Sequence, residues 1–280
     1  VPGGTPDVLN AVQHIVLFAQ RSNLWSIPTD CPQRERRGWL GDAHVSSNEA
    51  ALNHDMRAFY RHYLRLIRDD QLLGCQTPLG HGGYQGTNVT GQYSSCDADA
   101  CVGALPDVVP FTTGPYGGFC QGQPSGGNPA WQVAYHVLVH TLWRNYGDAG
   151  AIAEHYVGLH ALVDFWWRRA DAEGLVTVGG LGDGIDPLWP VQNTPAGAVS
   201  AFYALLAVHH RELFARVLGR ADDATAWEAK LSSGRAAYHA RFFNATAGGY
   251  CADEHSPHGS QTANVMALPL ARFPPRLWPA

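Results

Sequence analysis

The feature that constrains this chain most is a helical periodicity in its second half. Apolar residues recur there every three or four positions, and Gly147 and Gly219 each end a run. The spacing predicts helices over residues 129–146, 152–174, 199–217 and 227–242. A fifth helix is expected to begin at Ser260. Long helices in pairs, joined by short turns and without strand-like alternation, predict an all-α toroid of helical hairpins.

Two further helices are expected before residue 72. The first begins at Thr5-Pro6, because proline is favoured at the first helical position. Its apolar face is marked by Val8, Val12, Ile15 and Ala19. The second is predicted as one long helix over residues 47–71. The pattern therefore supplies about seven helices, fewer than a ring of six hairpins requires.

Residues 72–127 show no sustained periodicity of apolar residues and are rich in Gly, Ser, Thr, Pro and Cys. A structureless segment of this length is uncommon inside a compact domain unless it is functional or cross-linked. We interpret it as an insertion over one rim of the toroid. It either shapes the entrance to a site or decorates the surface.

Composition narrows the class of protein. With 280 residues and 45% hydrophobic content, the chain can bury one large core, so a single domain over residues 1–280 is expected. A net charge of −5 leaves no basic face for nucleic acid. No apolar run approaches the roughly 18 residues of a membrane span. Because the chain begins with Val1 and has no signal-peptide pattern, we expect it to be part of a longer polypeptide.

The positions of the cysteines indicate an oxidising cellular compartment. Four of the six lie in the glycine-rich segment, at Cys75, Cys96, Cys101 and Cys120. Clustered cysteines of this kind favour disulfides, and zinc is the weaker alternative because there is no CxxC pair. Acceptor sequences for N-glycosylation begin at Asn88 and Asn244. We therefore expect a secreted or lumenal glycoprotein.

The segment 28–42 is a loop unusually dense in charge. Two prolines and two glycines rule out regular structure there, yet it carries three carboxylates, three guanidinium groups and the Trp39 indole. One interpretation is a solvated connector. Against it stand Trp39 and Cys31, which such connectors seldom contain. Charged hydrogen-bonding groups beside a flat aromatic face are also the groups that bind a sugar.

The string PTDCPQRERRGWLGDAH, residues 28–44, resembles the signature of the α-L-rhamnosidases of glycoside hydrolase family 78. Further pieces occur in the family's order: Pro106-Asp107-Val108-Val109-Pro110, Asn128-Pro129-Ala130-Trp131, Tyr146-Gly147-Asp148, Gly182-Asp183 and Ser260-Gln261-Thr262-Ala263. The similarity covers nearly the whole chain. It implies an (α/α)6 barrel and an inverting glycosidase that releases terminal α-L-rhamnose from rhamnosides without a cofactor.

The resemblance also assigns roles to residues. Glu35 falls on the general acid, four residues before Trp39 and seven before Asp42. Positions that bind the sugar correspond to Asp30, Arg34, Trp39, Asp42, Trp131 and Asp183. A core tryptophan is an equally good interpretation of Trp131, and Gly184 stands where the family usually has Trp. We expect the guanidinium groups of Arg34 and Arg36 to pair with Asp30, Asp42 or sugar hydroxyls.

The sequence leaves open the role of Glu35 and whether the chain is catalytic. Without the surrounding motif, Glu35 would be read as an ordinary surface acid. The family's general base is a Glu beyond the Gln261-Thr262 segment, and no residue before Ala280 matches it. We therefore expect a barrel truncated before ring closure, and a non-catalytic rhamnose-binding homologue is the second interpretation. The histidine pair His136 and His140 lacks the carboxylate of a metalloprotease pattern, so no metal is predicted.

Overall fold

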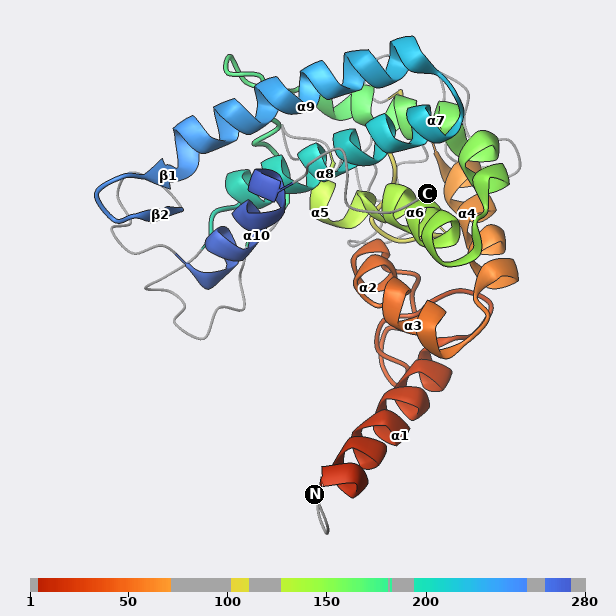
Figure 1. Ribbon diagram of the computed structural model, residues 1–280. Helices are drawn as coiled ribbons and strands as arrows, with labels where there is room; N and C mark the ends of the chain where they lie inside the picture. The colour runs from red at the N-terminus through yellow and green to blue at the C-terminus, as the bar shows by residue number, and fades with distance from the viewer. Residues whose placement is uncertain are drawn as a thin grey trace, which may run out of the picture.

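The computed structural model describes residues 5–71, 102–110, 127–180, 182, 194–250 and 260–272. These ranges are almost entirely helical, which confirms the all-α prediction (Figure 1). The helices are α1 (Thr5–Asn23), α2 (Leu40–Val45), α3 (Ser47–Asn53), α4 (Arg57–Asp70), α5 (Pro129–Gln132), α6 (Ala134–Tyr146), α7 (Ala149–Trp167), α8 (Ala196–Val217), α9 (Ala221–Phe242) and α10 (Gln261–Arg272). A short antiparallel pair, β1 (Phe243–Asn244) and β2 (Gly249–Tyr250), follows α9.

Two helical hairpins, α6 with α7 and α8 with α9, follow α5 in the chain, and α9 runs along the upper edge of the molecule in Figure 1. Gly147 ends α6 with φ 66°, and Gly219 has φ 69° between α8 and α9. This left-handed conformation costs little only for glycine. Both turns therefore lie where the sequence predicts them, whereas α7 ends at Trp167, before the predicted Gly174.

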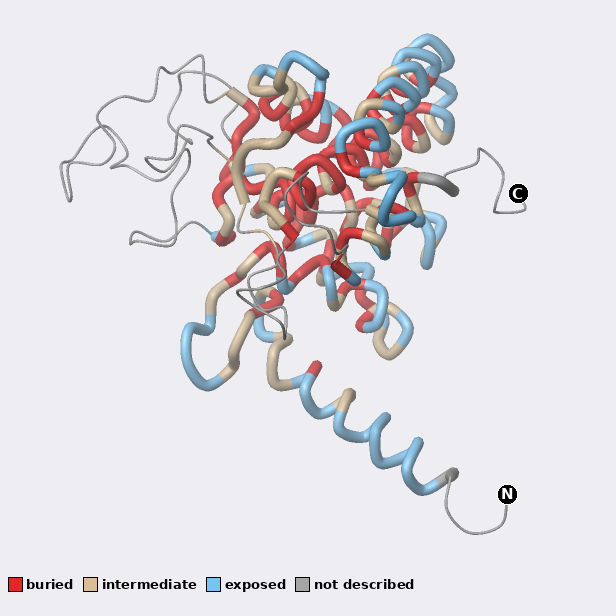
Figure 2. The backbone as a smooth tube through the Cα atoms, turned by 90° about the vertical axis from the view of Figure 1, so that its left-hand side faces the viewer, coloured by how far each residue is buried: buried red, intermediate tan, exposed pale blue. Residues whose placement is uncertain are grey.

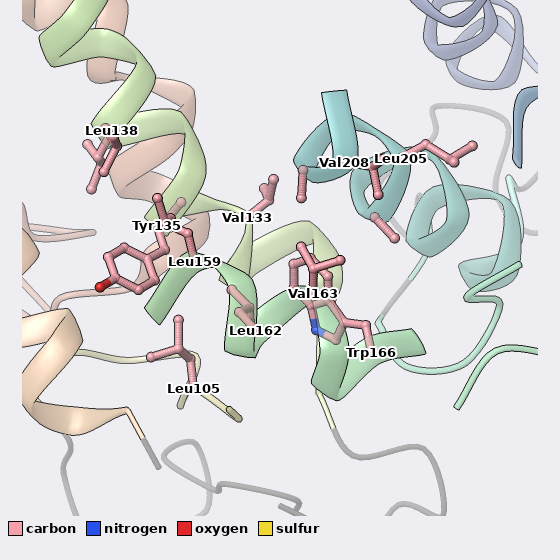
Figure 3. Close-up of a cluster of buried hydrophobic side chains, with 14 of the residues drawn as sticks. Leu105, Val133, Tyr135, Leu138, Leu159, Leu162, Val163, Trp166, Leu205 and Val208 are labelled. Carbon is pink, nitrogen blue, oxygen red and sulfur yellow. The ribbon is translucent and has the colours of Figure 1, made fainter. Parts of the chain in front are cut away.

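The core lies between α6, α7 and α8, as Figure 3 shows. Leu138, Leu159 and Val208, one from each helix, are fully buried. Leu105 joins the same cluster from the segment 102–110, which lies inside the range read as an insertion. Burying a leucine side chain contributes about 1.5–3 kcal/mol. The core therefore anchors the segment 102–110, whose other residues reach the site described below.

The single helix predicted over residues 47–71 is wrong, because the structure contains two helices, α3 and α4, with a break at residues 54–56. His54 is extended, with φ −140° and ψ 155°. The Tyr146 hydroxyl of α6 accepts the Met56 N–H at 2.9 Å and donates to the His54 carbonyl at 3.2 Å. A side chain from a distant helix thus takes up the backbone groups that a continuous helix would have paired.

Helix α1 projects from the rest of the molecule (Figures 1 and 2). The helix itself is confirmed, but its predicted apolar face is exposed: Val8 is 63% exposed, Val12 52% and Ile15 65%. No described residue covers this face. At the other end of the chain α10 begins as predicted, with the Ser260 hydroxyl accepting the Ala263 N–H at 2.9 Å.

Several predicted features fall outside the described residues. Of the cysteines only Cys31 is described, and its thiol is free. Asn88 lies outside as well, whereas Asn244 lies in the β1–β2 hairpin, where its Oδ1 accepts the Thr246 N–H at 2.9 Å. Among the described helices, none combines the length and the apolar character that crossing a membrane requires.

Candidate functional site

The segment between α1 and α2 folds into a closed loop. The Asp30 N–H donates to the Arg37 carbonyl at 3.0 Å, and the Arg37 N–H donates back to Asp30 Oδ1 at 2.8 Å. The Thr29 N–H donates to the Asn23 carbonyl at 2.9 Å, which fastens the loop to the end of α1. Residues 31–36 therefore form a tip whose two ends are fixed to each other.

Cys31 lies at the centre of this loop. Its thiol donates to Asp30 Oδ2 at 2.9 Å and accepts the Glu35 N–H at 3.2 Å. Burial by itself would raise the pKa of Asp30, but hydrogen bonds from the Cys31 thiol and from the Cys31 and Arg37 N–H groups outweigh it and lower the pKa. Asp30 is therefore ionised, and both of its oxygens already hold the loop together.

Glu35 lies exposed at the tip, where its Oε2 accepts the Trp39 Nε1–H at 2.8 Å. Asp42 follows in the first turn of α2. Its pKa is raised by burial and by the negative charges of Asp30 and Glu35. The structure thus brings the predicted acid and three of the predicted binding residues together in one place.

Asp30, Cys31 and Glu35 also have the spacing of a three-ligand metal site, since their ligand atoms lie within 4.8 Å of one another. The hydrogen bonds that close the loop account for the same spacing. We assign no metal to this group.

Of the partners expected for Arg34 and Arg36, neither Asp30 nor Asp42 pairs with them in the described part of the chain, and pairing with sugar hydroxyls stays a prediction. Arg36 Nε instead donates to the Pro32 carbonyl at 2.8 Å, and Arg36 has φ 57°. Arg34 is exposed, and no described acid pairs with it. The reason is local: Asp30 is satisfied by the thiol and by a backbone N–H, which leaves the Arg34 guanidinium available.

Trp39 is held by the segment 102–110. The Leu40 N–H donates to the Asp107 carbonyl at 2.9 Å, and the Val109 N–H donates to the Gly38 carbonyl at 2.8 Å. Trp39 thereby forms an antiparallel bridge with Val108. A Cβ at Gly38 would lie 1.8 Å from the Val109 oxygen, so only glycine permits this approach. The segment 102–110, far from Trp39 in the sequence, thus fixes the backbone that carries the Trp39 indole.

Trp131 lies next to the loop as well. A Cβ at Gly41 would lie 2.7 Å from Trp131 Cε2, so the indole packs directly against that glycine. The buried His44 Nε2 lies 2.7 Å from the Ala130 carbonyl. Since a carbonyl only accepts, Nε2 carries the proton. This contact ties α2 to α5, and half-buried Trp131 lies against Gly41, the residue before Asp42.

Sequence reasoning gave no role to Asp107, although it lies in the Pro106–Pro110 motif. Burial raises its pKa to about 7, against the opposing effect of hydrogen bonds from Asn128 and Gln132. No pattern in the sequence indicates this shift, because it depends on how the segment packs against α5. Asp183, the remaining predicted binding residue, lies outside the described residues.

Known proteins resemble this chain in sequence and in fold. Residues 5–277 match the model of the bacterial alpha-L-rhamnosidase 6 hairpin glycosidase domain. An alpha-L-rhamnosidase of Formosa agariphila is 26% identical over 276 residues, which are 96% of this chain and 25% of that protein. The structure of the alpha-L-rhamnosidase from Dictyoglumus thermophilum superposes with a TM-score of 0.73 and 31% identity, over 96% of this chain and 26% of that one.

The fold also matches the Streptomyces avermitilis alpha-L-rhamnosidase complexed with L-rhamnose, with a TM-score of 0.72 and 24% identity, over 98% of this chain and 22% of that one. The chain thus spans about a quarter of the length of these relatives. Because the family model matches nearly the whole chain, the protein belongs to the bacterial alpha-L-rhamnosidase six-hairpin glycosidase family.

Proposed function

We propose that this protein forms the sugar-binding side of an inverting α-L-rhamnosidase, and that it releases terminal rhamnose by transfer to water. Family membership supports the substrate class. The observation that carries the proposal is the contact between Glu35 and Trp39, 2.8 Å long, in a loop that contains Asp30 and is followed by Asp42 in the first turn of α2. It joins a proton donor to an aromatic surface that can face a sugar ring.

Glu35 is the proposed general acid. The Trp39 N–H occupies Oε2, so the transferable proton belongs on Oε1, from which it passes to the leaving glycosidic oxygen. As that bond breaks, positive charge develops on the sugar ring. The negative charge of Asp30, together with the charge that Glu35 acquires as it gives up its proton, would stabilise such a cation.

The remaining residues bind and orient the sugar. The Arg34 guanidinium offers several N–H donors to hydroxyl groups. Asp42 offers carboxyl oxygens, and the indoles of Trp39 and Trp131 can flank the apolar faces of the ring. Asp183 is assigned to the same role from the sequence motif alone. No cofactor takes part in the proposed reaction.

A second function, rhamnose binding without hydrolysis, is favoured by one observation. Inversion requires a second carboxylate about 6.5–9.5 Å from the acid, on the opposite face of the sugar, to activate water. Asp30 is a poor base because both of its oxygens accept hydrogen bonds from the loop. Asp42 is a poor candidate as well, because it directly follows the loop that carries Glu35, whereas the base must lie on the opposite face of the sugar.

Hydrolysis of an aryl α-L-rhamnoside by the purified chain tests the proposal. Glu35→Gln should lower kcat by about 10²-fold or more, the usual contribution of a general acid. Glu49→Gln, at an exposed acid on α3, is the matched control and should leave kcat unchanged. Proton NMR of the first-formed sugar should show inverted anomeric configuration.

Calorimetric titration with L-rhamnose separates the two functions. Binding without turnover would support the second function and exclude the first for this chain. Absence of both binding and turnover would contradict both.

A further inference from the structure

The buried side chain of Gln132 joins three segments of the molecule. Its Nε2 donates to the Leu105 carbonyl at 2.6 Å and lies 3.4 Å from Asp107 Oδ1. Its Oε1 accepts the Trp166 Nε1–H of α7 at 3.0 Å. Gln132 itself is the last residue of α5 and is 2% exposed. One amide therefore connects α5, α7 and the segment 102–110.

Chemistry fixes the orientation of this amide. An indole N–H can only donate and a backbone carbonyl can only accept, so Oε1 must face Trp166 and Nε2 must face Leu105. Space is limited as well: a Cβ at Gly127 would lie 3.2 Å from Gln132 Oε1. The side chain consequently has one arrangement that satisfies all its partners.

Each end of this connection leads to one of the two indoles of the site. Trp131 precedes Gln132 in α5 and packs on Gly41. On the other side, Asp107 and Val109 hold the backbone on both sides of Trp39, through Leu40 and Gly38. The two indoles are thus connected in two ways, directly through Gly41 and, from the other side, through the Gln132 amide and the segment 105–109.

Two aromatic walls can hold a sugar ring only at a defined separation, because dispersion contacts weaken within about 1 Å of the optimal distance. A misplacement of about 1 Å in a binding group is also enough to cost about 10²-fold in rate. The residue that fixes this separation therefore affects sugar binding without touching the sugar.

We propose that Gln132 is a positioning residue that sets the separation of the Trp39 and Trp131 indoles through its hydrogen bonds to Leu105, Asp107 and Trp166. The inference rests on the proposed sugar site and adds to it a residue for which the sequence motif gives no role.

The chain contains a matched control, Gln71. This glutamine is also buried, and its Nε2 donates to two backbone carbonyls, those of Gly103 at 3.0 Å and Gly158 at 2.9 Å. It anchors the same segment 102–110 to α7 at the end away from Trp39.

Removing the Gln71 amide takes the donor from two buried carbonyls. Removing the Gln132 amide takes the donor from the Leu105 carbonyl and the acceptor from the Trp166 N–H, so two buried groups lose a partner in each variant, at a similar cost in stability. Of the two glutamines, only Gln132 adjoins Trp131 in α5 and contacts Asp107, whose carbonyl accepts the Leu40 N–H next to Trp39.

The experiment compares Gln132→Leu with Gln71→Leu in the full chain. L-Rhamnose affinity is measured by calorimetric titration and the free energy of unfolding by urea titration. Gln132→Leu should weaken rhamnose affinity by about 10–100-fold, the loss that is typical when a partner that orients a metal ligand is removed. Gln71→Leu should weaken it less than about threefold while lowering the free energy of unfolding by a similar amount.

Two results overturn the inference while the proposed function stands. One is wild-type affinity in a folded Gln132→Leu protein. The other is an equal loss of affinity in Gln71→Leu, which would show a general effect of instability. Failure of the wild-type protein to bind L-rhamnose overturns the proposed function and the inference with it.

Gln132→Glu provides a second variant should Gln132→Leu fail to fold. The carboxylate still accepts the Trp166 N–H, but it cannot donate to Leu105 and it faces Asp107. As the pH falls, protonation of the introduced carboxyl restores one donor. The affinity of this variant relative to wild type should therefore recover toward acidic pH, and a constant ratio contradicts the inference.

Discussion

Helices α1 and α7 each contain 19 residues, yet they lie in opposite environments. Along α7 Ile152 and Leu159 are 0% exposed, whereas along α1 Val8 and Ile15 are more than 60% exposed. The two sequences predict the same kind of element, a helix with one apolar face. The difference is that α7 packs against α6 and α8, while no described residue covers the apolar face of α1.

The comparison shows that periodicity specifies a helix and a face but supplies no partner for that face. Most helical stability in proteins comes from packing of the apolar face. Helix α1 is held by hydrogen bonds at its middle and near its C-terminal end. Asn53 of α3 accepts from Gln13 at 2.8 Å and donates to Gln20 at 3.0 Å.

The largest expected effect is on the packed helices and comes from acid. Burial lowers the pKa of several histidines on α6, α7 and α8, to about 4 for His140, His155 and His209, and well below the ordinary value for His136 and His210. Their stabilising effect is complete above about pH 6.5, the unfolded value. It is lost as the pH falls toward 4, because the unfolded chain then binds more protons.

Each such histidine lowers the free energy of unfolding by about 1.4 kcal/mol per pH unit across that range. Asp107 has the opposite effect on the free energy of unfolding and offsets one histidine. Because its pKa is about 7, the folded state binds a proton at a higher pH than the unfolded chain does. Urea titrations at pH 7, 6 and 5 should show a steep net fall. A flat profile would mean that these histidines titrate normally.

The next largest effect distinguishes the two helices by mutation. Leu159→Ala removes a fully buried side chain from α7 and should lower the free energy of unfolding by about 2–5 kcal/mol, since it leaves a cavity. Urea denaturation monitored by circular dichroism measures the change. A loss below about 1 kcal/mol would show that the core around α7 collapses to fill the space.

The smallest effect is expected on α1. Val12→Ser replaces a side chain that is 52% exposed and should change the free energy of unfolding by no more than about 0.5 kcal/mol, as for other surface positions. The same denaturation measurement applies. A loss comparable to that of Leu159→Ala would show that the apolar face of α1 is covered in solution and would remove the contrast between the two helices.

Much of the fold could be predicted because it depends on local patterns. Gly147 and Gly219 end their helices in left-handed conformations that few other residues adopt. The break between α3 and α4 could not be predicted, because it is made by the Tyr146 hydroxyl from α6. The turn needs a partner that lies 90 residues away in the sequence.

The candidate site likewise has features that the local sequence predicts and features that depend on distant contacts. The motif places Asp30, Glu35, Trp39 and Asp42 within one short segment, so their proximity follows from the chain itself. The motif did not predict that Cys31 and the Arg37 N–H, rather than arginine side chains, would satisfy Asp30. Asp107 and Gln132 were also missed, because their importance depends on the packing of the segment 102–110 between α5, α7 and the loop.

The sequence alone determined the helical class, the positions of the main turns and the identity of the charged loop, since each depends on residues close together in the chain. Tertiary structure alone decided which apolar faces are buried, which acids have altered pKa values and how the two indoles are held. These properties depend on desolvation and on contacts between distant segments, and both arise only when the chain is folded.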